Sequence, residues 1–101
     1  MKVFLKMRNG TLAEGDFDLK TKQLKVLKGS MVSNSVSDTF IGAKTIERQR
    51  KGVIKNGKVI KDVTFTSASL AANFVTGFST NGYITWKDKN GKKLKDVISA
   101  E

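Results

Sequence analysis

The chain has 101 residues, 39% hydrophobic and 28% charged, a composition typical of one folded domain and not of a disordered segment. It contains no cysteine and no histidine, which excludes disulfides, thiolate chemistry and imidazole metal ligands. Nineteen lysines and arginines against nine acidic residues give a net charge of +10, an excess that attracts polyanions. No apolar run approaches the roughly 20 residues that span a bilayer, so we expect a cytoplasmic protein.

The first third of the chain alternates apolar and polar residues, which predicts three antiparallel strands. Residues 2–7 form the first strand, and the Asn-Gly pair at 9–10 is a strong turn signal. Residues 13–20 show clean period-two alternation. A turn at 20–22 then leads into a third strand that we expect to cover residues 23–33.

The middle of the chain predicts a helix from about Asp38 to Lys55, with Ser37 or Asp38 as its N-cap. The Asn-Gly pair at 56–57 is the expected C-terminal stop, since glycine readily adopts the left-handed conformation that ends helices. Apolar residues recur at helical spacing within this segment, at Phe40, Ala43, Ile46 and Val53.

A second helix is predicted after a short strand region that runs from Val59 to Thr66. Ser67 is the expected N-cap and Gly77 the expected end. Ala71 is one of several small residues that would let this helix pack closely on a sheet.

The last part of the chain predicts two strands, residues 82–88 and 92–97, around a hairpin turn at 90–91. The predicted fold class is therefore α+β, an antiparallel β-sheet with two α-helices packed on it. We expect residues 1–101 to form a single domain.

Catalytic and metal-binding patterns are absent from the sequence. Ser30, Ser67 and Ser69 have only lysines or carboxylates to activate them, and capping a helix is the commoner role of a serine such as Ser67. The segment 88–91 lacks the late glycine and the bidentate glutamate of a calcium loop. We therefore expect a protein that is not an enzyme and that uses no cofactor or metal.

Three sequence clusters occur in a fixed order along the chain. They are Val26-Leu27-Lys28-Gly29-Ser30, then Phe65 to Ala72, then Gly77 with Asn81-Gly82-Tyr83 and Trp86-Lys87, followed by Asn90-Gly91 and Leu94. In this order and spacing, over roughly residues 13–97, the chain resembles the domain of unknown function 4357 family. Arg48 falls where that family tends to carry an arginine, whereas Ala68 stands where it often has proline.

The resemblance implies an accessory role and no established activity. Similar domains occur appended to GIY-YIG-type nuclease domains and to restriction-modification subunits. The family is also distantly similar to the restriction-enzyme adenine-methylase-associated domain, which has been proposed to read DNA. By analogy, this context favours a role with nucleic acid.

Several residues are candidate nucleic-acid contacts. A helix N-terminus that carries Ser67 and Ser69 suits a phosphate group, and Tyr83 can stack on a base if it is exposed. The basic run 48–51, followed by Lys55, gives the first helix a charged face. The full candidate set is Lys28, Ser30, Arg48, Arg50, Lys51, Lys55, Lys58, Lys61, Ser67, Ser69, Asn81, Tyr83 and Lys87.

The same residues also have structural interpretations, which remain open at this point. Trp86 is expected to bury its ring and donate its N–H to a carbonyl. Arg48 alternatively pairs with Glu47, Asp62 or a carbonyl, and each lysine alternatively serves solubility alone.

We expect a non-catalytic nucleic-acid-binding accessory domain that contacts phosphates, with DNA favoured over RNA. The alternative is a protein-interaction module for an acidic partner, such as a nuclease or restriction-modification subunit. Salt separates the two, because binding through many phosphate contacts weakens steeply with salt and a packed protein interface weakens less. Attraction to membranes is disfavoured, since neither predicted helix combines a basic face with a broad apolar one.

Overall fold

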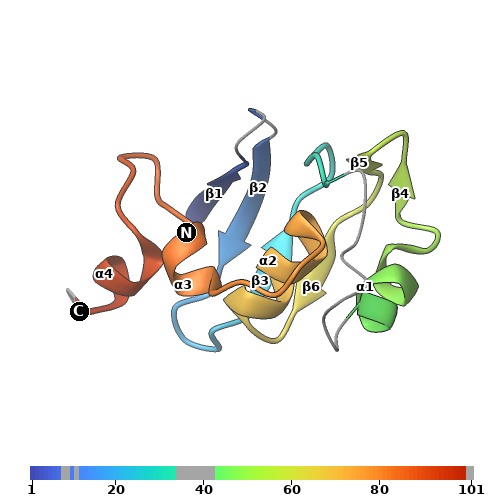
Figure 1. Cartoon of the computed structure of the whole chain (residues 1–101). Helices are drawn as coiled ribbons and strands as arrows, with labels where there is room; N and C mark the ends of the chain where they lie inside the picture. Colours follow the sequence, from blue (N-terminus) through green and yellow to red (C-terminus); the bar gives the residue numbers. More distant parts are fainter. Residues whose placement is uncertain (8–9, 11, 34–42, 100–101) are drawn as a thin grey trace.

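A four-stranded antiparallel sheet with helices on one side forms the body of the protein (Figure 1). This architecture comes from a computed structural model that describes residues 1–7, 10, 12–33 and 43–99. It confirms the predicted α+β class. The expected N-cap at Ser37 or Asp38 and the apolar Phe40 lie outside the described residues.

The sheet has the order β1-β2-β3-β6, in which β1 is Lys2–Lys6, β2 is Leu12–Phe17, β3 is Leu24–Val26 and β6 is Val63–Phe65. All neighbouring strands are antiparallel, which confirms the predicted meander. The third strand is shorter than predicted. It ends at Val26 because the chain turns at Gly29, whose φ of 94° is one that glycine adopts without strain.

Helix α1 (Ala43–Arg50) ends five residues earlier than predicted, and a hairpin follows it. The hairpin pairs β4 (Ile54–Lys55) with β5 (Lys58–Val59) around residues 56–57. Both turn residues have positive φ, 54° and 75°, as a two-residue hairpin turn requires. The Asn-Gly pair is therefore a hairpin turn, and its interpretation as a helix stop was wrong.

Helix α2 (Ala68–Thr76) has the predicted caps. The Ser67 hydroxyl accepts a hydrogen bond from the Leu70 N–H at 3.1 Å, and Gly77 ends the helix with a φ of 81°. Ala71 and its neighbour Ala72 are fully buried, because these small side chains let the helix axis approach β3 and β6 closely.

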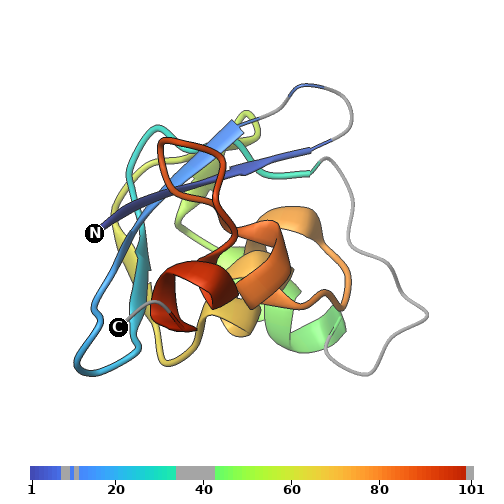
Figure 2. The same cartoon turned by 90° about the vertical axis from the view of Figure 1, so that its left-hand side faces the viewer.

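Two short helices replace the two predicted C-terminal strands. Helix α3 (Gly82–Thr85) packs between α2 and helix α4 (Leu94–Ser99) on the helical side of the sheet (Figure 2). Strand-like pairing is limited to Lys87, which bridges Phe4 and Lys93. Among the described residues, no helix is long and apolar enough to cross a membrane.

Local contacts explain why residues 82–85 are helical. The Asn81 side chain accepts a hydrogen bond from the Tyr83 N–H at 2.9 Å and so begins the turn. Gly82 lies against the start of α2, where an added Cβ would come within 2.2 Å of the Ala68 carbonyl. This contact joins residues that are 14 positions apart in the sequence, so the hydrophobic pattern of residues 82–88 does not predict it.

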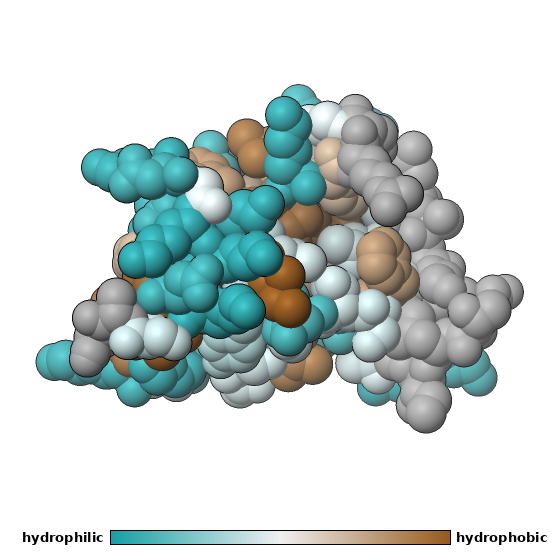
Figure 3. Space-filling model, turned by 60° about the vertical axis from the view of Figure 1, so that its left-hand side comes forward, coloured by the Kyte–Doolittle hydropathy of each residue, from teal (hydrophilic) through white to brown (hydrophobic). Residues whose placement is uncertain are grey.

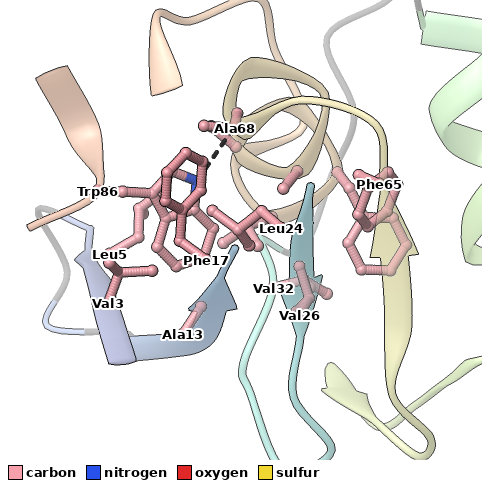
Figure 4. Packing of buried hydrophobic residues seen from close by; sticks show 14 of the residues in the cluster. Val3, Leu5, Ala13, Phe17, Leu24, Val26, Val32, Phe65, Ala68 and Trp86 are labelled. Carbon is pink, nitrogen blue, oxygen red and sulfur yellow. Dashed lines mark hydrogen bonds between the residues drawn. The ribbon is translucent and has the colours of Figure 1, made fainter. Parts of the chain in front are cut away.

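Trp86 lies in the core between α2 and the side of the sheet formed by β1 and β2 (Figure 4). Its side chain is fully buried near Leu5 and Phe17, and its indole N–H donates to the Ala68 carbonyl at 3.1 Å. This confirms the predicted structural role. The hydrogen bond matters because a buried N–H without a partner costs about 1–3 kcal/mol.

Candidate nucleic-acid interface

The β4–β5 hairpin brings lysines from two distant parts of the chain together. The turn at 28–30 is held against β5, since the Gly29 N–H donates to the Val59 carbonyl and the Val59 N–H donates to the Ser30 carbonyl, both at 2.8 Å. Lys28 therefore lies beside the hairpin that carries Lys55 and Lys58. These lysines are 27 or more positions from Lys28 in the sequence, and backbone hydrogen bonding makes them neighbours.

The end of α1 is joined to the same hairpin. The Val53 N–H donates to the Arg50 carbonyl at 3.1 Å, and the Ile60 N–H donates to the Val53 carbonyl at 2.8 Å. Helix α1 and the hairpin thus form one end of the molecule (Figure 1). We call this region the basic end and define it by Lys28, Arg48, Lys51, Lys55, Lys58 and Lys61.

The positive charges of the basic end are exposed and form no ion pair with any described residue. All six side chains are exposed to solvent. The ion pairs among the described residues join Met1 to Asp16 and Lys2 to Glu14, in the β1–β2 region. Lys55 lies directly opposite Lys58 across the hairpin, an arrangement of like charges that destabilises a strand pair.

Two described carboxylates, those of Glu47 and Asp62, lie near the six cations of the basic end. Glu47 lies on α1 among its basic neighbours. The carboxylate of Asp62 accepts a hydrogen bond from the backbone N–H of Lys28 at 2.8 Å, so it orders the turn at 28–30. The region retains a cationic excess that suits a polyanion.

Arg50 lies next to the basic end, but its side chain is partly buried and bonds the protein's own backbone. Its guanidinium group donates to the carbonyls of Phe74 and Val75, in the last turn of α2, and to the carbonyl and hydroxyl of Ser33. Burial lowers its pKa from the ordinary value, yet an arginine remains charged at neutral pH. The pairing with a carbonyl that the sequence suggested for Arg48 occurs at Arg50, whereas Arg48 is exposed.

Three serines of the candidate set bond the protein's own backbone. Ser30 is 3% exposed, and its hydroxyl both donates to the Glu14 carbonyl and accepts from the Glu14 N–H. The Ser67 hydroxyl caps α2, and the Ser69 hydroxyl accepts from the Gly82 N–H at 3.0 Å. A phosphate contact through any of these hydroxyls would compete with such bonds.

The remaining candidates lie away from the basic end. Asn81 caps α3, and Tyr83 is half-buried with its ring edge-on to Phe17 at a centroid distance of 6.5 Å. Lys87 is exposed and bridges Phe4 on β1, at the edge of the sheet opposite β6. The structure therefore divides the candidate set between two regions.

Lys44 was missing from the candidate set. It is exposed on α1, four residues before Arg48, and residues at that spacing are neighbours on a helix surface. The helical spacing was the signal that could have identified it. Within the described part of the chain, no three acidic side chains gather closely enough to hold a metal ion.

Comparison with known proteins assigns a family and no activity. The sequence profile of a family described as "Domain of unknown function (DUF4357)" matches residues 3–98. No curated protein matches the chain, and no solved structure matches it.

Proposed function

The chain belongs to the domain of unknown function 4357 family, and we propose that it is a non-catalytic nucleic-acid-binding accessory domain that holds phosphates at its basic end. The observation that carries the proposal is the group of six exposed cations, none of which forms an ion pair with a described residue. Their segments lie at one end of the molecule, which gives that end a positive field that a polynucleotide can neutralise. A cytoplasmic location belongs to the same proposal.

The composition of the basic end favours phosphate contacts over base recognition. Five of its six members are lysines, which act as point charges, and Arg48 is its only arginine. Bidentate base recognition in the major groove relies mainly on arginine. The distant resemblance to a restriction-associated domain supports DNA over RNA, and a nuclease or methylase subunit as the protein that the domain serves.

A pair of charge-reversal variants tests the proposal. Lys55→Glu with Lys58→Glu removes two cations from the basic end, whereas Lys92→Glu with Lys93→Glu makes the same change in net charge near α4. Binding of a labelled duplex and of a labelled single strand is measured by fluorescence anisotropy over a range of salt. We expect the first variant to bind more weakly and to reduce the slope of log affinity against log salt by about two.

The control variant separates a localised site from general attraction. The Lys92→Glu and Lys93→Glu variant is expected to keep nearly the wild-type affinity for the oligonucleotides and nearly the wild-type slope of log affinity against log salt. Equal losses in the two variants would show that only net charge matters, and no saturable binding near physiological salt would contradict the proposal.

A further inference from the structure

A groove with an apolar floor lies between the end of β1 and α3, away from the basic end. Its volume is about 520 Å³, within the range of about 300–1,000 Å³ found for ligand pockets. Leu5 and Met7 contribute to the floor from β1 and the residue after it, and Phe78 and Ile84 contribute from the other side. Figure 3 shows apolar side chains in a hollow bordered by hydrophilic ones. Phe78 is 51% exposed and Ile84 41% exposed, so large apolar surfaces face solvent here.

The outer edge of β1 has no strand partner among the described residues where it borders this groove, and we call it the open edge. Phe4 exchanges two hydrogen bonds with Lys87, at 2.7 and 2.9 Å, on the side of β1 that faces away from β2. The backbone groups of alternate residues face the same edge, so the N–H and C=O of Lys6 also face outward. The segment before Lys87 leaves the edge as α3, and no described residue bonds the Lys6 backbone there.

Successive side chains of β1 near this open edge point to opposite faces of the sheet. Val3 and Leu5 point to the core, so Phe4 and Lys6 point to the opposite face. Lys87 is paired with Phe4 and shares that face. A strand added beside Lys6 would place alternate residues against the apolar floor and the others near two lysines.

We propose that this groove binds an extended peptide of a partner protein, added as a strand beside Lys6. The peptide alternates large apolar residues, which contact the floor, with acidic residues, which lie near Lys6 and Lys87. Charge complementarity supports this occupant, since the described lining contains these two lysines and no carboxylate. The N–H and C=O of Lys6 favour a peptide over a nucleic acid as the occupant, because an added strand bonds both groups.

Titration with synthetic peptides tests the inference. The probe is an acetylated and amidated peptide that alternates phenylalanine or leucine with glutamate, and the control peptide has the same composition in two blocks. Calorimetry and amide NMR follow binding to the whole chain. We expect the alternating peptide to bind saturably, with shifts at Lys6, Phe78 and Ile84. Methylation of the peptide nitrogen that bonds Lys6 is expected to abolish most of the binding.

Matched protein variants localise the contact. Phe78→Ala is expected to weaken binding at least about tenfold, because it removes the largest exposed part of the floor. Leu70→Ala removes a side chain that is 41% exposed on α2 outside the groove, and it is expected to bind like the wild type. Lys6→Glu is expected to weaken binding, and Lys95→Glu on α4 is not.

Three results would overturn the inference. The first is equal binding of the alternating and block peptides, and the second is the absence of saturable binding. The third is an oligonucleotide that shifts Phe78 and displaces the peptide, which would make the groove a base-binding site. The double variant Lys55→Glu and Lys58→Glu, which is expected to bind nucleic acid more weakly, is expected to bind the peptide like the wild type. Peptide binding by this variant therefore tests the groove independently of the proposed nucleic-acid function.

Discussion

At the scale of single residues, Arg50 joins three segments that are far apart in the sequence. It extends from α1, contacts Ser33 and bonds the carbonyls of Phe74 and Val75 near the end of α2. The last carbonyls of a helix have no partner within the helix, so a planar guanidinium with several donors suits this place. Its ring contact, 5.9 Å from the Phe74 centroid, adds packing to the hydrogen bonds.

Arg50→Lys is expected to lower the free energy of unfolding by about 1–3 kcal/mol. A lysine keeps the charge but cannot donate in several fixed directions, so it cannot replace both hydrogen bonds to the partly buried Phe74 carbonyl. Arg48→Lys, on the exposed face of the same helix, is expected to change stability by no more than about 0.5 kcal/mol. Urea unfolding of both variants measures the difference, and a larger cost at Arg48 would contradict the assignment.

Asp18 links the stability of the β2–β3 turn to pH. Its carboxylate accepts hydrogen bonds from the N–H groups of Lys20 and Thr21, which lower its pKa below the ordinary value of 3.8. Since the pKa is lower in the folded state, the stabilisation is present above 3.8 and is lost as the pH falls through the folded value.

Asp18→Asn is therefore expected to make the acid-side loss of stability shallower than in the wild type. Thermal melting between neutral and strongly acidic pH measures that loss. A carboxyl NMR titration gives the folded pKa directly, and a midpoint at or above 3.8 for Asp18 would contradict the expectation.

At the scale of elements, the β4–β5 hairpin depends on the rest of the fold. Each strand has two residues, and isolated hairpins are marginally stable even when longer. Backbone bonds from Gly29 and Ser30 to Val59 hold it in place. This support lets Lys55 and Lys58 remain opposite each other despite their repulsion.

Lys58→Glu is expected to stabilise the protein by about 0.2–1 kcal/mol while weakening oligonucleotide binding. The substitution replaces a like-charge pair across the hairpin with an opposite-charge pair. Chemical unfolding and anisotropy on the same sample measure the two effects. If stability and binding both fall, Lys58 has a structural role that the repulsion argument does not account for.

At the scale of the whole molecule, the net charge of +10 opposes compaction. Two ion pairs occur among the described residues, and both are near the surface of the β1–β2 region. Added salt screens the remaining repulsion, since the Debye length falls from about 30 Å at 0.01 M to about 8 Å at 0.15 M.

The melting temperature is expected to rise with sodium chloride over this range. The Lys92→Glu and Lys93→Glu variant, which carries less net charge, is expected to show a smaller rise. Differential scanning calorimetry checks both, and a melting temperature that falls with salt would show that specific ion pairs outweigh the general repulsion.

Local patterns predicted some elements correctly and misassigned others for identifiable reasons. The meander and α2 follow from alternation and from capping by Ser67 and Gly77, which are local properties. Residues 82–88 were predicted as a strand but form α3 and two isolated bridges at Lys87, because Gly82 packs against Ala68. In α4, Leu94 is buried with Val97 and Ile98 half-buried, a helical spacing hidden in a short and strongly basic segment.

The sequence by itself determined the α+β class, the first three strands, α2 with both caps, the buried Trp86 and the cationic excess. These depend on composition and on contacts between near neighbours. The tertiary structure alone decided how the cations are divided, because long-range backbone bonds place Lys28 beside Lys58 and burial gives Arg50 its carbonyl partners. It also decided the groove beside β1, since an open strand edge exists only where the neighbouring segment turns away.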